Sequence, residues 1–214
     1  MLSIRVNSID DMKTISAKEF KELPKREFTS FFNSLSGAKP GFLIGSGHGQ
    51  DENVAIFNSI THLGASPPLL GFIQRPVDVE RNTYANILKY KHYSFNLITQ
   101  DFYKKAHQTS ARYEPEESEF EKVGLTSVYK KNFDCPFVAE SPLHILLELY
   151  DDVEIKSNNT RLIIGKVVSV SKLEFSDKHD RNLDFEKLNG VNISGLSDYY
   201  TLQKIESLPY AKVK

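Results

Sequence analysis

The sequence predicts a mainly β protein, built as a largely antiparallel sheet or barrel with peripheral helices. Alternating apolar and polar residues over 143–155, an Asn-Asn-Thr turn and a second long strand over 162–173 predict a β-hairpin. Other strand-like runs mostly follow one another, and they outnumber the segments with helical periodicity. Consecutive strands of this kind favour an antiparallel arrangement over a doubly wound fold.

The composition limits the class of protein. The 214 residues can bury a sizeable core, and no linker or internal repeat divides them. A net charge of -1 gives no electrostatic basis for binding nucleic acid or an anionic membrane surface. No apolar run reaches the roughly 20 residues that span a bilayer, and no secretory signal is visible. We therefore expect a cytoplasmic protein with a single domain over residues 1–214.

Two short helices are expected near the N-terminus. Ser16 can cap the first helix because Glu19 follows it at the spacing of a capping box. Pro24 ends this helix, and phenylalanine and leucine residues at helical spacing predict a second helix over 28–35.

Apolar runs between turn-forming residues indicate four further strands. Asp78 can cap a helix that continues to about Tyr90, and Asp101 can cap a second short helix. Residues 112–132 are polar and charged, so we expect a surface excursion with a helical turn at 118–123 and with Phe120, Val123 and Leu125 as its few apolar anchors. The four strands are expected at residues 41–45, 54–57, 69–73 and 93–98.

Several familiar chemical motifs are missing from the sequence. The glycine-rich residues 45–49 precede a strand-like run, whereas a dinucleotide-binding loop must open directly into a helix. The six histidines have no metal-ligand spacing, and the single cysteine, Cys135, is expected to be a buried small hydrophobe. We therefore expect no metal site and no Ser-His or Cys-His nucleophile.

Residues 53–96 carry the clearest functional signal. Two apolar runs flank a polar segment, and a basic helix start follows, so this region can hold a flat heterocycle and its phosphate. Arginine suits bidentate contact with phosphate oxygens, and hydroxyl groups add further donors. A solvated helix face explains the same charges equally well, and an ordinary helix terminus explains the later polar run at 107–110. The polar segment and the basic and hydroxyl residues are Asn58, Ser59, Ile60, Thr61, Arg75, Arg81, Thr83 and Lys89.

Ordered motifs over residues 28–173 resemble the flavin reductase-like, FMN-binding split-barrel family. They include N-x-A-x-F-N-S-I-T from Asn53, a Pro-Pro pair at Pro67, and R-N-T-Y-A-N-I from Arg81. The run A-H-Q-T-S-A from Ala106 is similar to the flavoredoxin-like branch. One departure is Arg81 itself, which stands where many members carry lysine.

The resemblance implies a six-stranded antiparallel split barrel that forms a homodimer, with one FMN per subunit near the dimer interface. Its core covers residues 28–173, and residues 174–214 form a C-terminal extension. Four residues are implied to line the isoalloxazine ring, largely through backbone groups: Asn58, Ser59, Ile60 and Thr61. Four are implied to hold the phosphate: Arg75, Arg81, Asn82 and Thr83. Four more are implied beside the ring or ribityl chain, or to reach over from the partner: His107, Gln108, Thr109 and Ser110.

The family implies an oxidoreductase that passes electrons from NADH or NADPH through FMN to an unidentified acceptor. No side chain need act as a catalytic acid or base, because the cofactor carries the chemistry. An FMN-binding electron carrier or flavin sensor without NAD(P)H reductase activity is the main alternative. A structural barrel with a degenerate pocket is a third, and the intact motifs at 58–61 and 81–83 argue against it.

Overall fold

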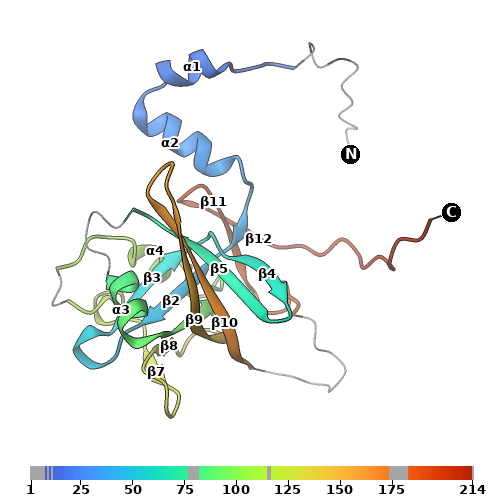
Figure 1. The fold of residues 1–214 in the computed structure, drawn as a ribbon. Helices are drawn as coiled ribbons and strands as arrows, with labels where there is room; N and C mark the ends of the chain where they lie inside the picture. Colours follow the sequence, from blue (N-terminus) through green and yellow to red (C-terminus); the bar gives the residue numbers. More distant parts are fainter. Residues whose placement is uncertain are drawn as a thin grey trace.

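One strongly curved sheet organises most of the chain (Figure 1). The computed structural model describes residues 8, 10, 12–76, 82–114, 117–173 and 183–213. Helices lie at the periphery of the sheet, and helices α1 and α2 stand away from it. None of the helices in the described part of the chain is long and apolar enough to cross a membrane.

The central sheet has seven antiparallel strands in the order β3-β2-β6-β9-β10-β5-β4. Its edge strands, β3 and β4, are consecutive in the chain and are separated only by residues 58–60. Because three residues span only about 10 Å, the two edges of the sheet must lie close together. The sheet therefore curls into a barrel that stays open between β3 and β4. The strands are β2 (Phe42–Ser46), β3 (Asn53–Phe57), β4 (Thr61–Ala65), β5 (Pro68–Gln74), β6 (His92–Leu97), β9 (Leu143–Ile155) and β10 (Thr160–Lys172).

The predicted antiparallel split barrel is confirmed, but the central sheet has seven strands and not six. The additional strand is β4, whose first residue, Thr61, was assigned to a polar loop. Thr61 pairs with Gly71 of β5, and the ladder continues through Ala65 with one irregularity after His62. Four of its five residues are exposed, so no alternation of buried and exposed side chains marks this edge strand in the sequence.

The described residues also form two smaller sheets and five α-helices. The two sheets contain β1 (Lys39–Pro40), β11 (Val191–Ser194) and β12 (Asp198–Thr201), and β7 (Ser127–Tyr129) and β8 (Pro136–Val138). The helices are α1 (Ala17–Glu22), α2 (Lys25–Ser34), α3 (Asn82–Tyr90), α4 (Tyr103–Gln108) and α5 (Glu119–Val123).

The helix ends test the predicted caps. Ser16 and Glu19 form the expected capping box of α1. The prediction that Asp101 caps the next short helix is wrong, because Phe102 occupies the N-cap of α4 without a side-chain hydrogen bond. Asp101 instead accepts a hydrogen bond from the Thr99 hydroxyl, 3.4 Å away. The predicted cap at Asp78 lies outside the described residues.

The apolar core consists of two main clusters on opposite faces of β2. Phe42 and Ile44 belong to the cluster that also holds Phe72 and Phe95. Leu43 points the other way, because successive side chains of a strand alternate between its faces, and it joins the second cluster. That second cluster includes the predicted anchors of the surface excursion and two residues of β11. These members are Phe120, Val123, Leu125, Val191 and Ile193.

The long hairpin is confirmed, with Asn159 at a φ of 56° in its turn. The alternation predicted along β9 holds as far as Leu149 and then shifts. An irregularity in the β9–β10 ladder leaves Tyr150 unpaired, so Gly165 pairs with Leu149 and Ile164 with Asp151. Val153 is therefore 41% exposed, contrary to the prediction that it shares a buried face with Leu149.

Candidate functional site

The polar segment 58–60 is held to its surroundings by two side chains. The amide of Asn58 donates hydrogen bonds to the carbonyl of Gly195, at 2.9 Å, and to that of Ile193, at 3.4 Å. These contacts attach the segment to the hairpin of β11 and β12. The peptide groups of 58–60 lie between β3 and β4, outside both strands, so they can serve a ligand.

Ser59 attaches the same segment to the end of β5. Its hydroxyl oxygen accepts a hydrogen bond from the Ile73 amide at 3.0 Å and lies 3.4 Å from the Ile73 carbonyl, to which it can donate. Ile73 precedes Arg75 by two residues, and Arg75 is exposed. The structure therefore brings the segment predicted to line the ring next to the first cation predicted to hold the phosphate.

Ile60 and Thr61 lie at the edge of an apolar groove of about 540 Å³. The groove is the open end of the barrel interior, since residues of the first core cluster form part of its wall. Its lining is almost wholly apolar and includes Phe42, Leu69, Leu70, Val170, Leu183 and Phe185.

The predicted phosphate residues do not all lie together. Asn82 is exposed at the start of α3, but Thr83 is buried, and its hydroxyl donates to Asn53 Oδ1 at 2.8 Å. Asn53 begins β3 and Asn58 follows its end, so the two lie roughly 16 Å apart along the strand. Thr83 is thus part of an internal polar cluster, and its hydroxyl already donates its hydrogen to Asn53. Arg81 lies outside the described residues.

That internal cluster continues to Glu119, whose Oε1 accepts a hydrogen bond from Asn53 Nδ2 at 2.8 Å. Burial raises the pKa of the Glu119 carboxyl above its usual value of 4.5, against the lowering effect of its hydrogen bonds. A carboxyl whose pKa is higher in the folded than in the unfolded protein stabilises the fold fully at a pH below its unfolded pKa. This stabilisation is lost as the pH rises through its folded pKa.

We therefore predict that Glu119→Gln removes a pH-dependent loss of stability. The free energy of unfolding of the wild type should fall relative to that of the variant as the pH rises from about 4 to about 7. Urea denaturation at several pH values measures this difference. A constant difference across the range would mean that Glu119 titrates in the same way in the folded and unfolded protein.

A second cation near the predicted phosphate segment was not expected from the sequence. Arg161 of β10 pairs with Gln74 of β5 and donates from Nε to Asp152 Oδ1 at 2.6 Å. Asp152 also accepts a hydrogen bond from the Tyr84 hydroxyl of α3 at 2.7 Å. Burial, together with this hydrogen bond, raises the pKa of Tyr84. The cluster therefore joins the end of β5 to the start of α3, the two elements between which Arg81 lies in the chain.

The hairpin register contains the signal that could have identified this cluster. Arg161 pairs directly with Glu154, and Asp152 is its diagonal neighbour on the same strand. One buried acceptor close by remains unsatisfied: Gln74 Oε1 has no hydrogen-bond partner among the described residues.

The polar run on α4 makes mostly local contacts. The Thr109 hydroxyl donates to the Ala106 carbonyl and the Ser110 hydroxyl to the His107 carbonyl, both at 2.8 Å. These bonds satisfy the end of the helix, as the helix-terminus interpretation predicts. Gln108 is exposed, and its amide is available to a ligand.

His107 has a partner that the sequence did not reveal. Its Nδ1 lies 2.9 Å from the Tyr199 hydroxyl, and the two rings meet edge to face. Burial and the neighbouring Tyr103 raise the pKa of Tyr199 to about 12. These three residues, with Lys104 and Ser197, line a small cavity of about 230 Å³.

The hairpin of β11 and β12 connects this cavity to the 58–60 segment. Tyr199 pairs with Ile193, whose carbonyl accepts from Asn58. The structure therefore groups Asn58, Ser59 and Arg75, and it joins His107 to them through the hairpin. The peptide groups of 58–60 and the Gln74 side-chain oxygen have no hydrogen-bond partner among the described residues. Together with the exposed cationic and amide side chains, they fit the polar edge of a flavin ring and a phosphate.

Comparisons with known proteins identify a family and a shared fold. Residues 36–185 match the flavin reductase like domain. A split-barrel protein of Shewanella frigidimarina, described as a flavin reductase, is 40% identical, with a TM-score of 0.88 over 94% of this chain and 100% of that chain.

Two more distant structures share the fold. Nitrilotriacetate monooxygenase component B of Bacillus cereus is 20% identical, with a TM-score of 0.78 over 92% of this chain and 98% of that chain. The flavoredoxin of Desulfovibrio vulgaris is 21% identical, with a TM-score of 0.68 over 81% of this chain and 92% of that chain.

Proposed function

This chain belongs to the flavin reductase like domain family, and we propose that it is an FMN-binding oxidoreductase. Electrons pass from NADH or NADPH through FMN to an acceptor that is a small molecule or a protein. We propose a cytoplasmic homodimer in which residues 1–214 form one domain, with residues 174–214 extending the barrel core.

The contact between Ser59 and Ile73 is the observation that carries this proposal. It sets the free peptide groups of 58–60 beside Arg75, so one ligand with a polar ring edge and a phosphate can reach both. Bound FMN supplies the hydride-accepting and electron-transferring chemistry. The protein supplies position and electrostatics, and no side chain is assigned as a catalytic acid or base.

Each predicted residue has a role in this proposal. Peptide groups of Asn58, Ser59, Ile60 and Thr61 line the ring, and the side chains of Asn58 and Ser59 keep that segment in place. Arg75, Arg81 and Asn82 hold the phosphate, and Thr83 fixes the start of α3 through Asn53. His107 and Gln108 approach the ring or ribityl chain, while Thr109 and Ser110 hold the end of α4.

The visible absorption spectrum tests the proposal. Protein loaded with FMN and desalted should retain the flavin, and anaerobic NADH or NADPH should then bleach it. Flavin that stays yellow until dithionite is added would favour the electron carrier or sensor. Protein that leaves desalting colourless, with no measurable affinity for FMN, would contradict the cofactor assignment.

A further inference from the structure

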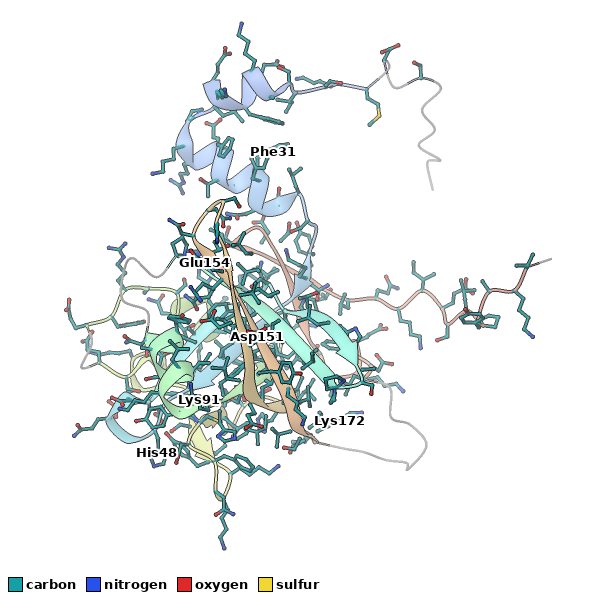
Figure 2. All side chains as sticks on the ribbon, in the orientation of Figure 1. Phe31, His48, Lys91, Asp151, Glu154 and Lys172 are labelled. Carbon is teal, nitrogen blue, oxygen red and sulfur yellow. The ribbon has the colours of Figure 1, made fainter. Side chains whose placement is uncertain are left out.

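The N-terminal arm, residues 12–35, is folded, but neither of its helices buries a residue against the described part of the chain. Its two helices meet through a cluster of four aromatic rings in tilted and edge-to-face contact, and Figure 2 shows Phe31 between α1 and α2, away from the sheet. The closest pair, Phe28 and Phe32, has ring centroids 4.4 Å apart, and Phe20 lies 5.1 Å from Phe32.

Neither helix of the arm buries a single described side chain. Helices of 6 and 10 residues are marginal in water, because isolated helices shorter than about 12 to 15 residues rarely hold together. Yet Phe28 is 38% exposed, Phe32 39% and Leu35 59%. An ordered helix pair with an uncovered apolar face favours docking on another surface.

The size of this face identifies the class of partner. Five large apolar side chains of the arm are exposed: Met12, Ile15, Phe28, Phe32 and Leu35. Their exposed area is roughly 350 to 550 Å², taking about 150 to 250 Å² for each whole side chain. One such contact, counting both surfaces, buries roughly 800 Å², the size of a weak crystal-packing contact. Two symmetric contacts bury roughly 1,600 Å², which is the size of a stable interface. A second copy of this chain provides two contacts, and a single different protein provides one.

The groove at the open end of the barrel is the matching surface. Its volume of about 540 Å³ and its apolar lining suit two or three large apolar side chains. Pro40, which forms part of its wall, belongs to β1, where the arm joins the barrel. A two-fold axis near β1 therefore lets each arm reach the groove of the other copy.

We propose that two copies exchange their N-terminal arms, with Phe28, Phe32 and Leu35 of one copy seated in the groove of the other. The groove is bordered by Ile60 and Thr61, so the arm of the partner closes the barrel end beside the proposed ring segment. The inference rests on the homodimer proposed above and not on the identity of the cofactor.

Charge substitutions on the arm test the exchange. The double variant Phe28→Glu, Phe32→Glu should raise the dissociation constant of the dimer at least 100-fold by sedimentation equilibrium. Ser30→Glu is the control, because Ser30 lies on the opposite side of α2, and it should leave the constant within about threefold. Leu69→Glu in the groove should weaken the dimer as strongly as the arm variant does. Circular dichroism checks that each variant remains folded.

Crosslinking identifies the occupant of the groove. Copies with Thr29→Cys, beside Phe32 on α2, are mixed with copies carrying Ala65→Cys at the groove, and a short bismaleimide is added. A covalent dimer on a denaturing gel is expected, and Ser30→Cys should give much less.

Other outcomes overturn the exchange. A chain carrying both Thr29→Cys and Ala65→Cys that links only within itself would mean that each arm closes its own groove. A Phe28→Glu, Phe32→Glu variant that remains a stable dimer would also overturn the exchange. So would a C-terminal tail that protects Ala65→Cys from the bismaleimide. That tail is the competing occupant, because Lys204 donates from its amide to Glu186 close to the groove, and Ile205 beyond it is 96% exposed. A monomeric wild type would contradict the homodimer itself, whatever the flavin result.

Discussion

Replacing Arg75 with glutamate should weaken FMN binding by roughly 100-fold, because it exchanges a charge-assisted hydrogen bond to phosphate for repulsion. Arg75 is exposed at the end of β5, next to the segment that Ser59 holds in place. The affinity for riboflavin, which has no phosphate, should change by less than about threefold. Titration of flavin fluorescence measures both affinities with the same protein sample.

Two control variants separate the phosphate contact from general electrostatics. Arg75→Lys should retain most of the FMN affinity, since it keeps the charge and loses only the bidentate geometry. Lys131→Glu makes the same change of charge in the turn between β7 and β8, and it should have little effect. Equal losses for FMN and riboflavin would show that Arg75 supports the ring segment instead of the phosphate. Unchanged FMN affinity would remove Arg75 from the site.

Gly45→Ala should strongly destabilise the barrel, with a loss of more than about 3 kcal/mol in the free energy of unfolding. A Cβ at this position would lie 2.2 Å from the Pro136 carbonyl oxygen and 2.7 Å from the Ser94 hydroxyl. The carbonyl belongs to backbone of β8, so the contact cannot be relieved by a change of rotamer. Urea denaturation of the purified variant gives the magnitude, and insoluble expression would be the extreme form of the same result.

Gly64→Ala is the matched control for this prediction. Its Cβ would meet only the Pro67 carbonyl oxygen at 3.4 Å, an ordinary contact, so the free energy of unfolding should change by less than about 1 kcal/mol. Similar losses for the two variants would mean that flexibility of the glycine, and not the close approach of β8, explains the effect at Gly45.

Local sequence patterns correctly predicted the elements that depend on residues close together in the chain. The capping box at Ser16, the hairpin turn at Asn159 and the buried anchors Phe120 and Val123 each depend on residues near one another in the chain. The cap at Asp101 was predicted by the same rules and is wrong, because Phe102, one residue later, occupies the N-cap of α4. Strand β4 was missed because an exposed edge strand has no apolar alternation to reveal it.

The candidate site was less accessible to sequence reasoning. Arg75 and the 58–60 segment were identified separately, but only the Ser59–Ile73 hydrogen bonds place them together. Thr83 has a suitable residue type and position for a phosphate contact, yet its hydroxyl is directed into the protein, toward Asn53. The Arg161–Asp152 pair and the Tyr199–His107 contact join residues whose relation depends on strand register and on a distant hairpin.

The sequence by itself determined the antiparallel β class, the family resemblance and the residue types available for binding a flavin. These follow from periodicity, turn residues and ordered motifs, all of which are properties of short stretches of chain. Only the tertiary structure decided which predicted residues meet, which hydroxyls already donate hydrogen bonds, and that the apolar side chains of the arm, residues 12–35, stay exposed. The physical reason is that hydrogen bonding and burial depend on contacts between distant segments, and the curl that brings β3 beside β4 sets those contacts.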